Sequence, residues 1–151
     1  IIGNFNNNTE FGIVGKINNN NFSNLPSYQV ADLSEIKLDK AYVLLQNKDN
    51  KVEKYEIEIV NIYNQDYPQS KTFKIKITDK RLLAYTGGVV QGMSGTPIIQ
   101  NNKVIGAISH AIENYPSYGY AVYIGWMLKG DKLLIPFFNF DYLVIYLVHF
   151  L

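Results

Sequence analysis

Hydrophobic and polar residues alternate with a period of two along much of this chain, a pattern typical of β-strands that bury one face. The clearest examples are YEIEIV at residues 55–60 and TFKIKIT at residues 72–78. Tyrosine and isoleucine alternate with glutamate in the first, and phenylalanine and isoleucine alternate with lysine in the second. The lysines of KTFKIKITDKR are therefore expected on the solvated face of a strand rather than in a phosphate-binding patch.

Turn residues divide the remaining hydrophobic runs into further strands. Residues 40–63 predict two strands joined by a turn at 47–50. TPIIQ and KVIGAISHAI predict a hairpin, with Asn101 and Asn102 as its two-residue turn. FGIVGKI, residues 11–17, contains two glycines and predicts a curved or bulged strand.

Helical periodicity is nearly absent. DKRLLAYTG, residues 79–87, predicts one helical turn. YGYAVYIGWML, residues 118–128, predicts a last strand that leads into a short helix. Many short strands at this spacing predict an all-β domain, either a barrel or a sandwich.

The C-terminal segment LLIPFFNFDYLVIYLVHFL, residues 133–151, has a different character. It is dense in aromatic and aliphatic residues and is preceded by Lys129 and Lys132, which suits a membrane anchor. It also contains Pro136 and Asp141, and a charge near the centre of a span costs roughly 2.5–3.5 kcal/mol on insertion scales. A buried terminal strand and an aberrant tail of a truncated or frame-shifted product are the alternatives to membrane contact.

Composition narrows the function classes. The chain has 151 residues, enough for one modest domain with a core. Its formal net charge of +1 gives no support for nucleic-acid binding. It has no cysteine, which excludes disulfides, thiolate metal sites and a cysteine nucleophile. No secretory signal peptide is visible.

The segment GMSGTP, residues 92–97, surrounds Ser94 with two glycines and a proline before a strand resumes. A nucleophilic serine needs a bent backbone that exposes its hydroxyl, and N–H groups that face the oxygen on which charge develops. Glycine allows the required dihedral angles and leaves room for a substrate carbonyl. Taken alone, the segment fits both a plain glycine-rich turn and a nucleophile with the N–H groups of Gly92 and Ser94 as oxyanion donors.

The longer block TGGVVQGMSGTPIIQNNKVIGAISHAIENYPSYGYAVYIGWML, residues 86–128, resembles the nucleophile region of trypsin-like serine peptidases. It most closely resembles the stage IV sporulation protein B peptidase family. FGIVGKI, YEIEIVNI and KIKITDKRLLAYTGG resemble that family in order and spacing, so the resemblance covers residues 1–128. It implies a trypsin-like double β-barrel and a serine endopeptidase that acts through Ser94, with no metal or cofactor.

The resemblance also implies that Asp79, in ITDK, is the acid of a catalytic triad. Without the resemblance, an aspartate after a strand is typical of a helix N-cap or a turn. The base of the family is a histidine in a Gly-His-Gly-type string upstream of the nucleophile, and this sequence has no such string.

The two histidines of the sequence, His110 and His149, both follow Ser94. In the trypsin-like layout, Ser109 and His110 line the substrate cleft and pair with the substrate backbone. His110 is therefore either a cleft-lining or core residue or a replacement for the missing base. His149 lies in the tail and is assigned no role.

The missing histidine string, the start without methionine and the unmatched tail lead us to expect a truncated copy. Its parts are a partial peptidase domain at 1–128, lacking part of the first barrel, and a divergent tail at 129–151. The resemblance implies export to the space between the forespore and mother-cell membranes. There it implies a protein or peptide substrate in a membrane-bound processing complex of sporulation. The alternative is a catalytically inactive β-domain that binds a peptide or protein partner by β-augmentation.

Overall fold

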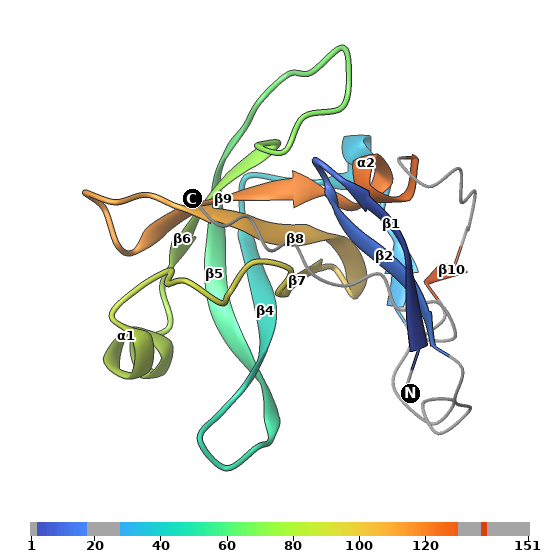
Figure 1. Cartoon of the computed structure of the whole chain (residues 1–151). Coiled ribbons are helices and arrows are strands. Elements are labelled where there is room, and N and C mark those ends of the chain that lie inside the picture. Colours follow the sequence, from blue (N-terminus) through green and yellow to red (C-terminus); the bar gives the residue numbers. More distant parts are fainter. Residues whose placement is uncertain (1–2, 18–27, 130–136, 139–151) are drawn as a thin grey trace.

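The computed structural model describes residues 3–17, 28–129 and 137–138 (Figure 1). Its helices are η2 (Leu33–Glu35, a 3₁₀ turn), α1 (Lys80–Thr86) and α2 (Ile124–Lys129). Its strands are β1 (Gly3–Thr9), β2 (Gly12–Ile17), β3 (Tyr28–Val30), β4 (Lys40–Gln46), β5 (Val52–Ile62), β6 (Phe73–Ile77), β7 (Pro97–Gln100), β8 (Lys103–Ala111), β9 (Tyr118–Tyr123) and β10 (Phe137–Phe138).

Six of the strands form a closed antiparallel barrel. The ring runs β8-β7-β4-β5-β6-β9 and closes through direct pairing of β9 with β8. Each neighbouring pair in the ring is antiparallel. The fold is therefore all-β, as predicted, and of the kind expected of a trypsin-like peptidase domain.

The period-two pattern sorts side chains between the inside and the outside of this barrel. In β6, Phe73, Ile75 and Ile77 are buried, whereas Lys74 and Lys76 alternate with them and are only partly covered. In β5 the buried positions are Tyr55, Ile57 and Ile59, and glutamates take the alternate positions. Apolar burial along both strands stabilises the barrel, and the lysines lie on its solvated face as predicted.

The predicted turns are confirmed. Asn101 and Asn102 join β7 to β8 with φ angles of 50° and 61°, the left-handed geometry that a two-residue hairpin turn requires and that asparagine tolerates. In the turn between β4 and β5, the N–H of Asn50 donates to the carbonyl of Asn47 at 3.1 Å. Asn50 has a φ of 60°.

Helix α1 is a short element with a defined cap at each end. The side chain of Asp79 accepts a hydrogen bond from the N–H of Arg81, and Gly87 ends the helix with a φ of 75°. The prediction of a helical turn at 79–87 is confirmed, and so is the short helix α2 after β9.

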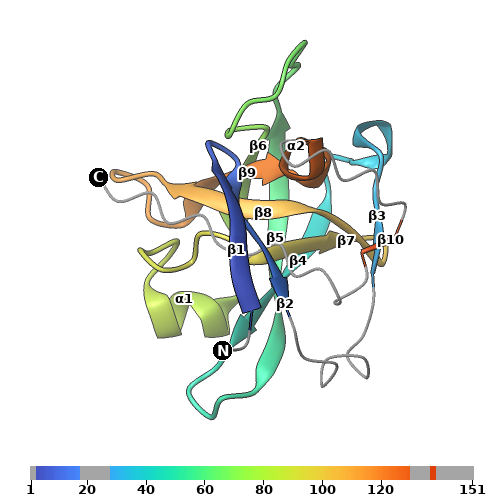
Figure 2. The same cartoon turned by 45° about the vertical axis from the view of Figure 1, so that its right-hand side comes forward.

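The remaining strands lie at the periphery of the barrel (Figure 2). β3 runs parallel to β8 at Val104, and β10 pairs with the other side of β3. β1 and β2 form a separate two-stranded hairpin, and Phe11 at its tip is buried with the core residues. Apart from Phe137 and Phe138, the tail predicted at 129–151 lies outside the described residues beyond Lys129.

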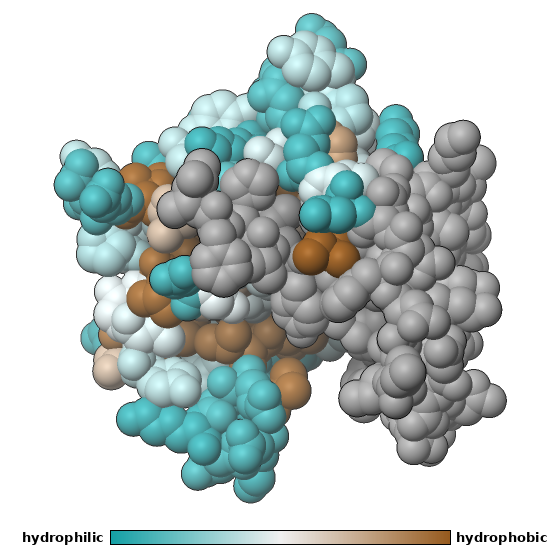
Figure 3. All heavy atoms as spheres, in the orientation of Figure 1, coloured by the Kyte–Doolittle hydropathy of each residue, from teal (hydrophilic) through white to brown (hydrophobic). Residues whose placement is uncertain are grey.

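The loops that project from the barrel carry mostly polar residues. Figure 3 shows hydrophilic residues at the tip of the β4–β5 hairpin and in the connection between β5 and β6, with apolar residues on the surface between them. None of the helices in the described ranges has the length and apolar character needed to cross a membrane.

Candidate active site

The segment around Ser94 is a tight, anchored turn between α1 and β7. Gly92 and Gly95 have φ angles of 95° and 87°, which glycine adopts without strain. The N–H of Met93 donates to the carbonyl of Val90 at 3.1 Å, and the carbonyl of Met93 accepts from Thr96 at 3.0 Å. The Met93 side chain is buried and holds the turn against the core. The two glycines are thus required by the backbone, as the sequence predicted.

The turn is joined to β8 beyond the end of the β7–β8 ladder. The N–H of Gly95 donates to the carbonyl of Ile108 at 2.8 Å, and the N–H of Ile108 donates to the carbonyl of Thr96 at 3.0 Å. The half-buried Ser94 donates its hydroxyl to the backbone carbonyl of Ser109 at 3.1 Å. This bond fixes the direction of the Ser94 side chain.

A β-bulge makes the Ser109 carbonyl available for this bond. In the β8–β9 register, Ile108 pairs with Ala121 and His110 pairs with Tyr120, so Ser109 is an extra residue without a partner in β9. Bulges of this kind re-aim a backbone group or side chain near functional sites. The bulge brings Ser109 and His110 to the place where the Ser94 turn meets β8.

The backbone N–H groups of Gly92 and Ser94, like that of the exposed Gln91, have no acceptor within the described ranges of the protein. Free N–H groups beside a serine are what an oxyanion hole needs. A Cβ built on Gly92 meets no atom within 4 Å, so the space on that side of the turn is open.

The hydrogen bonds of Ser109 determine the tautomer of His110. The buried Ser109 hydroxyl donates to the carbonyl of Ser70 at 2.8 Å, which uses its single proton. The same oxygen lies 3.0 Å from Nδ1 of His110, so it accepts a hydrogen bond there and Nδ1 carries the proton. In the neutral imidazole, the lone pair is then on Nε2, as in the base of a serine peptidase.

Asp79 lies at the N-terminus of α1, in an interaction with Arg81. Its Oδ1 accepts from the N–H of Arg81 at 2.9 Å and from Nε at 3.1 Å, and its Oδ2 accepts from Nη2 at 2.8 Å. These hydrogen bonds from Arg81 lower the pKa of the Asp79 carboxyl to about 2. The helix-capping interpretation of Asp79 is confirmed, and its role as a triad acid stays a prediction.

The structure therefore joins Ser94 to the carbonyl of Ser109 and His110 to its hydroxyl, and it engages the carboxylate of Asp79 with Arg81. Sequence reasoning missed the bulge and the link from Ser109 to Ser70. A signal was present, since Ser109 and His110 are adjacent polar residues that end the continuous apolar run VIGAI of this strand.

Other described regions offer no comparable set of reactive groups. No cluster of three or more histidine, aspartate or glutamate side chains that could hold a metal ion occurs in the described part of the chain. A hollow of about 370 Å³ lies beside Ser34 and Asn101, at the opposite end of the β7–β8 hairpin from Ser94. Of its charged residues, Glu35 and Lys103 pair with each other, and Nζ of Lys37 donates to the carbonyl of Ser34 at 3.4 Å.

Comparison with known proteins identifies the family. Residues 1–128 match the model of the SpoIVB peptidase S55 family. No curated protein and no solved structure matches the chain. The match spans the barrel and the Ser94 turn, as the resemblance of the block at 86–128 predicted, and the chain belongs to the SpoIVB peptidase S55 family.

Proposed function

We propose that this chain is a serine endopeptidase domain in which Ser94 attacks the carbonyl carbon of a peptide bond. The observation that carries the proposal is the turn at Ser94, where two glycines with positive φ place a serine hydroxyl beside two free N–H groups. The family match supports the same activity class.

The N–H groups of Gly92 and Ser94 are the proposed oxyanion donors. Attack by Oγ converts the carbonyl oxygen into an oxyanion, and N–H groups positioned before the reaction stabilise it. Removal of one such donor typically lowers the rate by about 10²–10³. The leaving amine takes a proton, and water then hydrolyses the acyl-enzyme.

The proposed base is His110. Its assignment rests on the Nδ1–H tautomer that Ser109 supports, because Nε2 is then able to accept a proton. The Ser94 hydroxyl donates to the Ser109 carbonyl in the structure, so activation requires it to exchange that carbonyl for the imidazole. Asp79 is assigned as triad acid by resemblance, and that role requires its release from Arg81.

The proposed substrate is an extended polypeptide that pairs with the end of β8. β7 pairs with β8 as far as Ala107, and Gly95 and Thr96 continue this contact to Ile108, so the edge of β8 without a partner on that side begins after Ser109, at His110 and Ala111. A peptide can add to such an edge by main-chain hydrogen bonds. By resemblance, the substrate belongs to a membrane-bound processing complex between forespore and mother cell.

The alternative function is a β-domain that binds a peptide without cleaving it. Two observations favour it, the absence of a Gly-His-Gly-type string from the sequence and the engagement of Asp79 by Arg81. The same β8 edge would then capture a partner by β-augmentation.

Cleavage of a peptide library separates the two functions. The full chain and its Ser94→Ala variant are incubated with peptides derived from a whole proteome, and new termini are counted by mass spectrometry. A peptidase produces new termini that are absent with Ser94→Ala. Equal results for both chains, with peptide binding retained, would establish the binding function instead.

A further inference from the structure

On the outside of the barrel, two lysines of β6 and one lysine just before it lie over two tyrosine rings of β9. Nζ of Lys74 lies 5.1 Å from the centroid of the Tyr118 ring, and Nζ of Lys76 lies 5.7 Å from the same centroid. Nζ of Lys71 lies 5.1 Å from the centroid of the Tyr120 ring. These five residues are named the lysine–tyrosine face. β6 and β9 lie side by side in the barrel (Figure 1).

Strand register connects this face with the candidate active site. Lys74 pairs with Tyr120 across β6 and β9, and Tyr120 pairs with His110 across β9 and β8. Paired residues of antiparallel strands have their side chains on the same face of the sheet. A row of side chains therefore runs from Lys74 through Tyr120 to His110. His110 follows Ser109, whose carbonyl accepts the hydrogen bond from the Ser94 hydroxyl.

None of the three lysines of this face forms an ion pair within the described structure. The ion pairs there involve Lys40, Arg81 and Lys103, and none involves a lysine of the face. Glu58 is opposite Lys76 in the β5–β6 register, but it forms no ion pair with it. The face is thus a local concentration of positive charge in a chain whose net charge is only +1.

The tyrosine rings hold these ammonium groups in place, which favours the binding of an anionic ligand. A cation over an aromatic ring is attracted to the ring face, which restricts the lysine side chain before any ligand binds. Lys74 and Lys76 are two residues apart on one strand, so their Cα atoms are about 7 Å apart. That is also the spacing of alternate side chains in an extended peptide, so the face matches carboxylates at alternate positions.

We propose that the lysine–tyrosine face binds an acidic stretch of the polypeptide substrate as it extends away from Ser94. The proposal deepens the proposed function, but binding to the face requires no catalysis. Two strand spacings, about 10 Å, separate His110 from Lys74, which an extended peptide spans in about three residues. The favoured substrates thus carry glutamate or aspartate within a few residues of the position held at His110.

Peptide binding to the full chain carrying Ser94→Ala tests the proposal without catalysis. The probes are two fluorescein-labelled ten-residue peptides, one with glutamate at alternate positions and one with glutamine in their place. Anisotropy is measured at low salt. We expect the glutamate peptide to bind more tightly, and its affinity to fall as salt screens the exposed charges.

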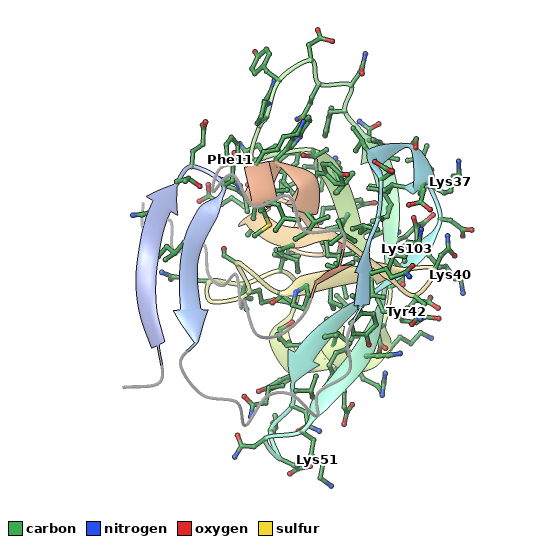
Figure 4. The ribbon with its side chains drawn as sticks, turned by 90° about the vertical axis from the view of Figure 1, so that its right-hand side faces the viewer. Phe11, Lys37, Lys40, Tyr42, Lys51 and Lys103 are labelled. Atoms are coloured by element: carbon green, nitrogen blue, oxygen red, sulfur yellow. The ribbon has the colours of Figure 1, made fainter. Side chains whose placement is uncertain are left out.

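Two triple variants with the same net charge provide the matched comparison. In the first, the three lysines of the face are changed to glutamine. In the second, Lys37→Gln, Lys40→Gln and Lys51→Gln remove three lysines from the side of the molecule shown in Figure 4, where β4 stands opposite β9 in the ring of strands. Replacing the lysines of the face by arginine instead keeps their charge.

We expect the glutamate peptide to bind about tenfold more weakly to the first variant, since each exposed ion pair contributes a few tenths to one kcal/mol. Binding to the control and arginine variants should stay within about twofold of the parent. Equal losses in both glutamine variants, or no preference for glutamate, would overturn the proposal. Binding of the same chains to phosphatidylserine vesicles is also measured. If the first variant loses more affinity for the vesicles than for the glutamate peptide, the proposal is overturned in favour of a membrane surface. Every chain in this experiment carries Ser94→Ala, so the results do not depend on whether the protein is a peptidase.

Discussion

Ser109 organises the candidate active site at the scale of single residues. Its carbonyl accepts the Ser94 hydroxyl, and its own hydroxyl bridges the Ser70 carbonyl and Nδ1 of His110. The contact with Ser94 depends on the bulge, because a residue paired in the ladder would have its carbonyl directed at a neighbouring strand. The Ser94 hydroxyl and the His110 imidazole are thereby both linked to one buried serine.

Asp79 gives a residue-scale prediction of pH dependence. The pKa of its carboxyl is lowered to about 2 by hydrogen bonds from Arg81, so the folded state favours the ionised form. The stabilisation is complete above the unfolded pKa near 3.8 and is lost as the pH falls through about 2. Asp79→Asn should therefore lower the free energy of unfolding by about 1–2 kcal/mol at pH 7, a figure discounted for the exposure of Arg81.

Urea unfolding at pH 7, 4 and 2 checks this expectation. The difference between parent and Asp79→Asn should narrow between pH 4 and pH 2. Asp66→Asn, in the exposed connection between β5 and β6, is the control and should change little at any pH. A difference for Asp79→Asn that stays constant across this range would contradict the role given to the Arg81 hydrogen bonds.

At the scale of elements, closure of the barrel depends on close contact between β8 and β9. A Cβ built on Gly106 would lie 2.0 Å from the carbonyl oxygen of Val122 and 3.3 Å from the Phe73 ring. The strands can meet there only because position 106 has no side chain. Gly106→Ala should force them apart and lower the free energy of unfolding by about 3 kcal/mol.

Gly87→Ala is the matched control for this prediction. Gly87 has a φ of 75°, but a Cβ there meets no atom within 4 Å. Its substitution therefore adds only backbone strain, about 1 kcal/mol. Both variants are compared by urea unfolding. The account of barrel closure is wrong if Gly87→Ala is the more destabilised of the two.

At the scale of the whole molecule, the barrel places the candidate active site next to the lysine–tyrosine face. Strand β8 brings Ser109 and His110 to the Ser94 turn, and its pairing with β9 continues the same outer face to the lysines of β6. The hollow beside Asn101 lies at the other end of the β7–β8 hairpin. The proposed nucleophile Ser94 and the lysines that form no ion pair in the described structure are thus on one connected region.

Local patterns in the sequence were sufficient to predict most of the strands, turns and helices of this molecule. Alternation in 72–78 predicted β6 and its solvated lysines, and two asparagines predicted the turn between β7 and β8. Glycines around Ser94 predicted its bent turn. These features depend on interactions between neighbours in the chain, which composition and spacing reveal directly.

Long-range pairing could not be predicted in the same way. Closure of the barrel joins β9 to both β6 and β8, and the link from Ser109 to Ser70 spans 39 residues. The stacking of Lys74 on Tyr118 likewise depends on which strands become neighbours. Such contacts are set by the tertiary fold, so the sequence alone left the roles of Ser109 and His110 open.

The most direct test of the central claim is the intact mass of the chain after treatment with a fluorophosphonate probe. The account predicts one covalent addition, absent in Ser94→Ala and formed at least about 10²-fold more slowly in His110→Gln, because the base is lost. No addition to the parent chain would contradict the account and favour the peptide-binding function. An addition that persists in Ser94→Ala would contradict the assignment of the nucleophile.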